Sequence, residues 1–573
     1  MNSPVSKGGV GNRRSSVLVT EWTVSDFKSL EYVTLPLTNF VLLTGANSSG
    51  KSSVIQSLLL LAQSSEDELI LNGPLVRLGE PKDVIRSGRS SVSFGFTCQV
   101  RRSQEEAKAE WSFEMGFSTH GQDLQISSFH AAVDGNPVLA ATNDRLNART
   151  RNEVDPEGRF GDSLLRVQEI RGKAEPSRTY VSFRGFHPEA LLYNRQPKQV
   201  LSSLRRTYSK KALKDDPERL IDLYSELLSF QRLAEGGPEF SEIRKKLNNL
   251  LPSQGRSLNK EMDQGQLDDM FVEVSDHIGG EWRATPIVRF MSGPGYQARF
   301  VSRRPPGTLG LQDQFSDAIR CLALAEESLR SIRESIRYLG PLREEPQVVS
   351  ATGARYRNVP AGSHGEYTAD LLARSKNRNI PFRDHKGRSL KEKLPDAVSL
   401  WTAYLGVGET VGVEDQGKLG RGLRITVNGI PRDLTTIGVG ASQLLPVITI
   451  VLAADAGSIV MLEQPELHLH PAVQSRLADF FLFARPDVTL IVETHSEYLV
   501  TRMRRRAAEG SISGDKVALM FAEQIDGTTQ VRRLHMDSLG DLDVWPAGFF
   551  DTQEEESRAL VAAISKKISN GRP

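Results

Sequence analysis

The sequence predicts an α/β fold organised around a glycine-rich loop, and three apolar runs typical of buried strands support this prediction. Residues 40–43 form an apolar run typical of a buried strand, and a glycine- and serine-rich loop follows at residues 45–52. Residues 54–62 then contain neither Pro nor Gly, which favours a helix. Two later runs, residues 458–462 and 488–492, predict buried strands that end in acidic or polar residues. We therefore expect a core sheet of parallel or mixed strands flanked by helices.

The loop matches the pattern G-x-x-x-x-G-K-[ST] at every position. Its glycines let backbone N–H groups turn inward around phosphate oxygens, and the N-terminus of the following helix adds a partial positive charge. The lysine supplies a full charge, and the serine hydroxyl of Ser52 is a ligand for Mg²⁺. The flanking strand and helix argue against a chance match. The expected nucleotide-binding residues are Gly45, Asn47, Ser48, Ser49, Gly50, Lys51, Ser52 and Ser53.

Composition limits the class of protein. The chain has 573 residues, which is too many for one compact core, and its 39% hydrophobic and 25% charged residues are ordinary for a globular protein. A net charge of +1 means that nucleic acid, a possible partner, would need a local basic patch. Cys98 and Cys321 are too few for a disulfide framework, which favours free thiols in the cytoplasm. The longest apolar run, residues 444–453, is too short to cross a membrane.

The residues before the loop add a family resemblance. Residues 27–30, Phe-Lys-Ser-Leu, precede a short predicted hairpin, and this order resembles the start of an ABC-type ATPase head of the SMC and OLD (overcoming lysogenization defect) group. The resemblance implies a mixed α/β head with an antiparallel β subdomain and a helical insertion. The chain then divides into a disordered tail (1–16), an N-terminal lobe (17–100), an insertion of antiparallel strands and helices (101–330), a C-terminal lobe (331–510) and a C-terminal extension (511–573).

Local patterns predict elements within these regions. Alternating hydrophobic residues at 92–100 and 111–117 predict antiparallel strands, and residues 118–190 mix short strands and loops. Apolar residues at 197–251 recur at helical spacing. Asn428-Gly429 predicts a tight turn between two strands of a hairpin.

Small residues at 436–443 precede an apolar helix that we expect to start near Leu444. This arrangement resembles the signature loop of ABC-type ATPases, which in that family binds the γ-phosphate of a nucleotide held by the opposite subunit. Either Gly440 or Ser442 would make this contact, because the motif is not a literal LSGGQ. A capped helix start is the structural alternative.

Residues 458–471 resemble the Walker B strand and D-loop of the same group. The resemblance places Glu463 at the Mg²⁺ position and Gln464 where the family has its catalytic glutamate. Because glutamine cannot accept the proton of an attacking water, Glu466 or Glu463 would serve as the base, or hydrolysis would be slow. The spacing of His468 and His470, two residues apart in this motif, is more typical of structural histidines than of a zinc site.

Residues 488–496 end in Thr-His-Ser, and His495 resembles the switch histidine that contacts the γ-phosphate in this family. Three other features have two interpretations each. Arg343 either reaches a nucleotide or interface or simply follows a strand. Residues 502–506 form either a nucleic-acid patch or a solvated helix end. Asp541 and Asp543 either resemble the D-x-D of an OLD-type Toprim nuclease or act as local capping residues.

The ending at residues 545–551 resembles the C-terminal extension of a bacterial subgroup that lacks the Toprim domain. The resemblance implies an ATPase that binds ATP and Mg²⁺, forms a homodimer or higher oligomer around the nucleotide, and gates a separately encoded effector in defence against phage or plasmids. A Mg²⁺-dependent nuclease and a nucleotide-gated scaffold with little turnover are the alternatives. No membrane association is expected.

Overall fold

The computed structural model describes residues 17–100, 109–143, 163–194 apart from 172 and 175–177, 288–289, 312–345, 347–349, 361–546 apart from 418, 419, 514 and 515, and 552–569. Three predictions lie wholly or partly outside these residues. They concern the tail at 1–16, the helical pattern at 197–251 and most of the ending at 545–551.

The N-terminal half supplies the antiparallel part of a sheet that has 17 strands among the described residues. These strands are β1 (Val17–Phe27), β2 (Leu30–Pro36), β4 (Ser91–Val100), β5 (Ala109–His120), β6 (Asp123–Val133), β7 (Asn136–Thr142), β8 (Ser163–Ile170), β9 (Lys173–Ala174), β10 (Arg178–Arg184), β11 (His187–Asn194) and β12 (Val288–Arg289). They pair in the order β2-β1-β4-β5-β6-β7-β8-β10-β11-β12, with β9 also on β8. Alternating hydrophobic residues correctly predicted β4 and β5, whereas residues 118–190 form longer strands than expected.

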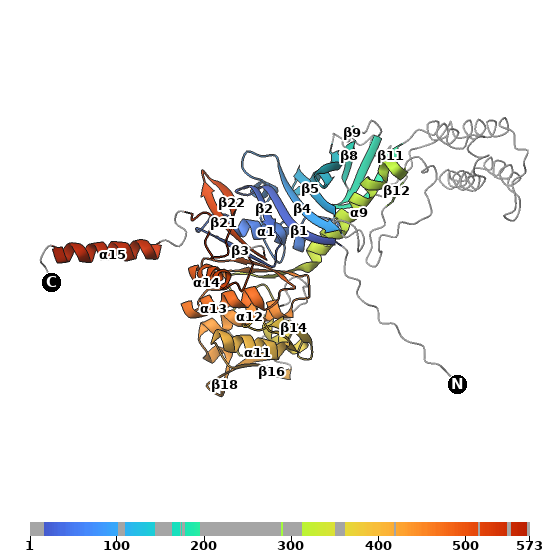
Figure 1. Cartoon of the computed structure of the whole chain (residues 1–573). Coiled ribbons are helices and arrows are strands. Elements are labelled where there is room, and N and C mark those ends of the chain that lie inside the picture. Colours follow the sequence, from blue (N-terminus) through green and yellow to red (C-terminus); the bar gives the residue numbers. More distant parts are fainter. Residues whose placement is uncertain are drawn as a thin grey trace, which may run out of the picture.

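The second part of the sheet is parallel and contains the strand before the glycine loop. The strands β13 (Ile336–Leu339), β19 (Ile459–Glu463), β20 (Thr489–Glu493), β3 (Phe40–Gly45) and β21 (Val517–Ile525) pair in this order. The antiparallel neighbour of β21, β22 (Thr528–Leu534), meets β2 where Thr529 pairs with Leu30. This contact joins the two parts into one continuous mixed sheet (Figure 1).

Helices cover both faces of the parallel strands, and each face has its own hydrophobic core. Successive side chains of a strand point to opposite faces, so Val41 and Leu43 of β3 lie in one core and Phe40 and Leu42 in the other. The first core is completed by α1 (Lys51–Gln63) and α9 (Gln312–Ser335). Burial on both faces explains why these strands are continuous apolar runs rather than alternating ones.

The second core is covered by the helices drawn below the sheet in Figure 1. These are α10 (Thr368–Arg374), α11 (Leu394–Leu405), α12 (Val439–Ala453), α13 (Pro471–Phe483) and α14 (Glu497–Ala508). Short strands and turns lie beside them: β14 (Asn379–Arg383), β15 (Ser389–Lys393), β16 (Thr410–Asp415), β17 (Arg421–Val427), β18 (Ile430–Asp433) and η2 (Leu434–Thr436). The tight Asn-Gly turn predicted between β17 and β18 is confirmed, with positive φ at Asn428 (52°) and Gly429 (73°).

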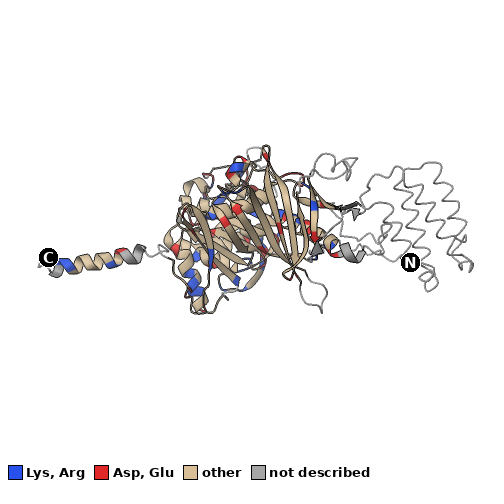
Figure 2. Ribbon diagram, turned by 90° about the horizontal axis from the view of Figure 1, so that it is seen from above, with Lys and Arg blue, Asp and Glu red and all other residues tan. Residues whose placement is uncertain are grey.

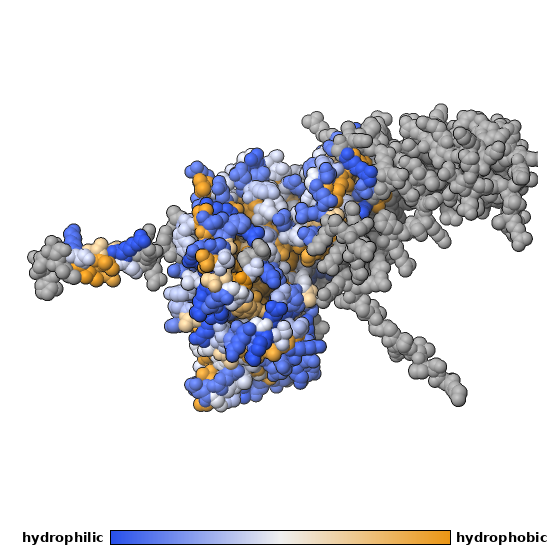
Figure 3. Space-filling view, viewed as in Figure 1, coloured by the Kyte–Doolittle hydropathy of each residue, from blue (hydrophilic) through white to orange (hydrophobic). Residues whose placement is uncertain are grey.

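Two predicted domain boundaries fall within the sheet. β4 and β5 pair directly across the boundary at residue 100, and β21 lies beside β3 although it follows the boundary at residue 510. The short helix α2 (Pro81–Val84) lies before β4. At the C-terminus, α15 (Thr552–Ser569) presents an apolar face to solvent in Figure 3, formed by Leu560, Val561 and Ile564.

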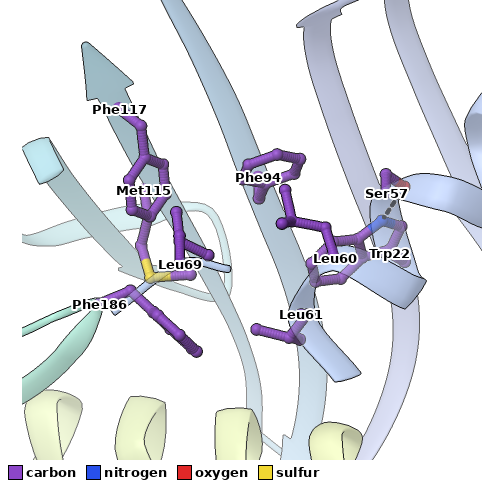
Figure 4. Close-up of a pocket in the computed structure, with 9 residues that line it drawn as sticks. All are labelled: Trp22, Ser57, Leu60, Leu61, Leu69, Phe94, Met115, Phe117 and Phe186. Atoms are coloured by element: carbon purple, nitrogen blue, oxygen red, sulfur yellow. Dashed lines mark hydrogen bonds between the residues drawn. The ribbon is translucent and has the colours of Figure 1, made fainter. Parts of the chain in front are cut away.

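A small cavity lies in the first core between α1 and the antiparallel strands (Figure 4). Its one polar contact among the residues drawn is the hydrogen bond that Trp22 Nε1 donates to Ser57 Oγ at 3.0 Å. The remaining lining is apolar, which indicates a packing defect rather than a site for a phosphate-bearing ligand. The lining residues are Trp22, Ser57, Leu60, Leu61, Leu69, Phe94, Met115, Phe117 and Phe186.

The described residues agree with several expectations from composition. Basic and acidic positions are interspersed along the ribbon in Figure 2, consistent with a net charge of +1. Cys98 and Cys321 are buried free thiols, as predicted. Among the described helices, none combines the length and apolar character needed to cross a membrane.

Candidate nucleotide-binding site

The glycine loop connects β3 to α1, as the sequence predicted. Gly45 ends β3 at φ 142°, and Gly50 precedes α1 at φ 91°. A Cβ on Gly45 would lie 2.0 Å from the carbonyl oxygen of Ala522, and one on Gly50 would lie 2.4 Å from Thr529 Oγ1. Glycine is therefore required at both positions for two reasons. The backbone has a positive φ, and β21 and β22 approach too closely to leave space for a side chain.

The loop offers the features that a polyphosphate requires. Lys51 Nζ donates to the carbonyl oxygens of Ala46 at 2.7 Å and Gly45 at 3.2 Å, so the ammonium group lies over the loop. Burial lowers the pKa of Lys51, although the charge of Glu493 opposes this shift. Gly50 has no side chain with which to cap the first turn of α1. Ala46, Asn47 and Ser48 of the loop are exposed, and the positive N-terminal end of α1 is the kind of position at which anions bind.

The contact of Ser52 was not predicted from the sequence. Its hydroxyl donates to the carboxylate of Glu493, with its Oγ 3.0 Å from Oε1 and 2.9 Å from Oε2. Glu493 ends β20, the strand adjacent to β3, and is only 3% exposed. One sequence feature could have indicated this contact: the predicted buried strand at residues 488–492 is followed directly by an acid, Glu493, and then by Thr494 and His495.

Glu463 ends β19 and pairs in register with Glu493 of β20. Its Oε1 accepts a hydrogen bond from the hydroxyl of Tyr338 on β13 at 2.8 Å. Burial, together with the neighbouring Glu493, raises the pKa of Glu463 from an ordinary 4.5 to about 7. The two acids thus form a buried carboxylate pair beside the glycine loop.

This raised pKa makes the stability of the protein depend on pH. Because the folded-state value exceeds the unfolded one, the stability linked to Glu463 is fully present below about pH 4.5 and is lost as pH rises through about 7. We expect Glu463→Gln to remove the part of the pH dependence that belongs to Glu463 and to stabilise the fold by roughly 3 kcal/mol at pH 8. Urea denaturation from pH 5 to 8 measures the effect, with Glu556→Gln on α15 as control. A variant whose stability follows the wild type across this range would contradict it.

Gln464 follows Glu463 in the left-handed region, at φ 44°, and its backbone N–H donates to the carbonyl of Glu493 at 2.8 Å. The buried side chain of Arg343 supports this turn. Its Nη1 donates to the carbonyl oxygens of Glu463 at 3.0 Å and Gln464 at 3.3 Å. Burial lowers the pKa of Arg343 to about 10, which leaves it charged at neutral pH. Arg343 therefore stabilises the backbone of the turn at Glu463 and Gln464, which we call the acidic turn.

Glu466 and His495 meet across the same turn. Glu466 Oε1 accepts a hydrogen bond from the backbone N–H of His495 at 2.7 Å, and burial raises the pKa of Glu466. The His495 side chain is exposed at the rim of the site. Partial desolvation and the positive charge of Lys51 lower the pKa of His495, which favours its neutral form. The fold therefore brings Glu463, Gln464, Glu466 and His495 to the sheet edge that carries the glycine loop.

The signature-like segment differs in detail from the prediction. Helix α12 begins at Val439, five residues before the expected start at Leu444. Ser442 consequently lies inside the helix, is 4% exposed, and its Oγ donates to the carbonyl of Val439 at 2.7 Å. Gly440 lies in the first turn, where an added Cβ would approach the carbonyl oxygen of His468 to 3.3 Å. The exposed residues at this helix start are Gly438 and Val439.

The structure shows local contacts for the His and Asp residues of two other motifs. His470 Nδ1 accepts a hydrogen bond from the backbone N–H of Ala472 at 3.2 Å and caps α13, which is a structural role. Asp543 Oδ1 accepts hydrogen bonds from the backbone N–H groups of His535 and Val544, each at 2.9 Å. Asp541 forms an ion pair with Arg504, with 3.0 Å between Oδ1 and Nη2.

The arginines at residues 502–506 take part in ion pairs. Arg502 and Arg506 bind the buried carboxylate of Asp479 on α13, each with a closest distance of 2.6 Å. Arg505, on α14, pairs with Glu509 at 2.7 Å at the exposed C-terminal end of that helix. Because their charges are already paired within the protein, these arginines are more typical of a structural helix end than of a basic patch that binds nucleic acid.

Comparisons with known proteins match two regions. Residues 358–501 are similar to the family described as "AAA domain, putative AbiEii toxin, Type IV TA system". Residues 512–560 are similar to the family described as "Protein of unknown function (DUF3696)". No curated protein matches the sequence.

Several solved structures of Smc head domains are also similar. One, from Pyrococcus furiosus, is bound to the C-terminal domain of ScpA; it has 11% identity, covers 91% of this chain and 96% of that chain, and gives a TM-score of 0.35. The head domain with a coiled coil and joint from Pyrococcus yayanosii has 12% identity, coverages of 90% and 97%, and a TM-score of 0.33. The head domain from Thermotoga maritima has 8% identity, coverages of 90% and 99%, and a TM-score of 0.31.

Proposed function

We propose that this chain binds ATP with Mg²⁺ and hydrolyses it to ADP and phosphate. The observation that carries the proposal is the convergence of Lys51 and Ser52, at the start of α1, with the buried acids Glu463 and Glu493, which end the strands β19 and β20. A polyphosphate needs the cations and N–H groups, and its metal ion needs the acids. The match of residues 358–501 to an AAA domain supports an ATPase.

Each residue then has a role that follows from its position. Lys51 and the first turn of α1 hold the β- and γ-phosphates. Mg²⁺, when bound beside Ser52, neutralises phosphate charge. The Gln464 amide orients the attacking water, and Glu463 and Glu466 are the nearby carboxylates able to accept its proton. His495, at the rim, donates to the γ-phosphate.

Phosphate release from Mg-ATP by the purified chain tests this function, with the Lys51→Ala chain as the blank. Release above the blank supports hydrolysis. ATP binding without release over hours would instead support the nucleotide-gated scaffold, for which Gln464 provides a physical reason. Failure of the wild-type chain to bind ATP would refute both functions.

We also propose that two copies complete each other's sites. The glycine loop and the signature-like start of α12 lie on different elements of one chain, and Val439 at that start is 51% exposed. A second copy would place its residues 438–442 against the γ-phosphate held by Lys51, with Asn47 and residues 465–470 in the contact. The resulting two-fold pair would contain two equivalent sites.

Gly438→Arg is expected to abolish ATP-dependent pairing and to lower turnover by at least about 100-fold while preserving the fold. No atom lies within 4 Å of a Cβ added at Gly438, so an arginine fits the single chain but obstructs a partner docked there. Light scattering with and without ATP measures the pairing. Gly412→Arg on β16 is the matched control, because its added Cβ is equally unobstructed.

Complementation sharpens this test. Mixing Gly438→Arg chains with Lys51→Ala chains should restore one intact site in each mixed pair, and therefore part of the turnover. A Gly438→Arg chain that keeps full turnover at high dilution would rule out the shared site.

The biological role that we propose is the gating of a separately encoded effector in the bacterial cytoplasm, as part of defence against phage or plasmids. The similarity of residues 358–501 to a family described as a toxin of a type IV toxin–antitoxin system supports this setting. Recovery of one co-encoded protein with the tagged chain, dependent on ATP and lost in Lys51→Ala, would support it. Recovery that is equal in both chains would contradict nucleotide gating.

A further inference from the structure

The two buried acids of the site are held by different neighbours, and this difference separates their roles. Ser52 Oγ lies 2.9 Å and 3.0 Å from the two carboxylate oxygens of Glu493. The Glu463 carboxylate instead accepts the hydroxyl of Tyr338 at 2.8 Å, on the side away from the glycine loop. We infer that Glu493, and not Glu463, is the carboxylate that holds Mg²⁺ beside Ser52. The inference rests on the proposed function and refines its metal site.

Strand order provides the geometric reason. β20 lies between β3 and β19, and Glu493 pairs in register with Leu43 on one side and Glu463 on the other. Neighbouring strands are about 4.8 Å apart, so Glu463 starts one strand spacing farther from the loop than Glu493. The side chain at the end of β20 therefore reaches the Ser52 hydroxyl directly. A side chain at the end of β19 would have to extend across β20 to do so.

The chemistry of the pair fits a magnesium ion. Mg²⁺ in nucleotide sites commonly takes one or two protein oxygens and completes its shell with phosphate oxygens and water. Ser52 and Glu493 supply a hydroxyl and a carboxylate that already touch, on a buried wall of the site. In the part of the chain that the structure describes, no group of three or more His, Cys, Asp or Glu side chains is arranged to hold a metal. In this assignment the phosphate oxygens of ATP and water complete the shell of the metal ion.

The assignment leaves Glu463 free for another role. Its carboxylate stays beside Gln464, at the position where a proton acceptor for the attacking water is needed. Gln464 and Glu493 are also linked, because the backbone N–H of Gln464 donates to the carbonyl of Glu493 at 2.8 Å. The chain thus lacks an acid at position 464, directly after β19, but has an additional one, Glu493, at the end of β20.

A matched pair of variants tests the assignment. Glu493→Gln keeps the size of the side chain and an oxygen that accepts from Ser52, but it removes the charge that attracts the metal. Glu463→Gln makes the same change one strand away. ATP affinity is measured by calorimetry in EDTA and in Mg²⁺, and their ratio gives the enhancement by the metal. We expect Glu493→Gln to lower this enhancement at least about tenfold, and Glu463→Gln to leave it within about threefold of wild type.

A second measurement does not depend on calorimetry or turnover. With a non-hydrolysable ATP analogue present, electron paramagnetic resonance of free Mn²⁺ counts the metal bound, and Glu493→Gln should bind less than Glu463→Gln. Circular dichroism establishes that each variant is folded. If Glu493→Gln does not fold, Glu493→Asp, which keeps the charge on a shorter side chain, should still weaken Mn²⁺ binding more than Glu463→Asp.

The outcomes separate this inference from the proposed function. Loss of the metal enhancement in Glu463→Gln alone, an equal loss in both variants, or no loss in either would overturn the inference. In each of these cases the wild-type chain still binds Mg-ATP, so the proposed function stands. A wild-type chain that binds no ATP would refute the function itself.

Discussion

Replacing Lys51 with alanine should lower the affinity for ATP by at least about 100-fold and eliminate phosphate release. In the structure its ammonium group lies over the loop, 2.7 Å from the carbonyl oxygen of Ala46. On binding, the same group would turn to the β- and γ-phosphates. Charge-assisted hydrogen bonds of this kind contribute about 1.5–3 kcal/mol each, so the loss of two accounts for the expected factor. Calorimetry with ATP measures it directly.

The control for this experiment is Lys82→Ala, which removes an exposed lysine on α2 that pairs with Glu80 at 2.8 Å. It removes one positive charge, as Lys51→Ala does, but lies outside the glycine loop. Unchanged affinity in Lys51→Ala would refute the assignment of the loop as a phosphate site. Equal weakening in both variants would point to a general effect of charge.

Restoring an acid at position 464 should increase turnover. Gln464→Glu places a carboxylate where the family that this chain resembles has its catalytic glutamate. General-base catalysis contributes about 10²–10⁴-fold, and we expect the lower end of this range. The reason is that Glu463 and Glu466 are buried nearby, and repulsion between like charges raises the pKa of an added carboxyl group. The backbone of residue 464 is tied to Glu493, so the new side chain should start from the same position.

Single-turnover phosphate release measures this change without a contribution from product dissociation. Gln122→Glu, in the exposed turn between β5 and β6, adds the same charge in the antiparallel part of the sheet, away from the glycine loop, and should leave the rate unchanged. If Gln464→Glu does not accelerate release, the proton of the attacking water is already accepted elsewhere, and Glu463 and Glu466 become the residues to change next.

The features that depend on a few adjacent residues could be predicted from local sequence patterns. The strand–loop–helix unit around Lys51 is one, because its apolar strand, its glycines and its helix are contiguous and each has a local conformational requirement. The turn at Asn428 and Gly429 is another, since positive φ at both positions favours these two residue types. The strands that end at Glu463 and Glu493 were also predicted, because burial on both faces makes them continuous apolar runs.

Helix starts and strand lengths were less predictable. The apolar pattern located α12 from Leu444 onward, but the helix begins at Val439, and Ser442 is buried within it rather than capping it. Pro446 also lies inside this helix, where the packing of its buried neighbours outweighs the local cost of proline. In such cases tertiary burial overrides the local signal.

The contacts between distant side chains depend on how the strands pair in the folded chain. Ser52 and Glu493 are 441 residues apart, and their contact depends on the order in which parallel strands pair, which a local pattern does not encode. The support of the acidic turn by Arg343, and the place of β21 beside β3, depend on the same sheet. The types of residue in the site could therefore be predicted from the sequence. Their division into a Ser52–Glu493 pair and a Tyr338–Glu463 pair was set by the sheet.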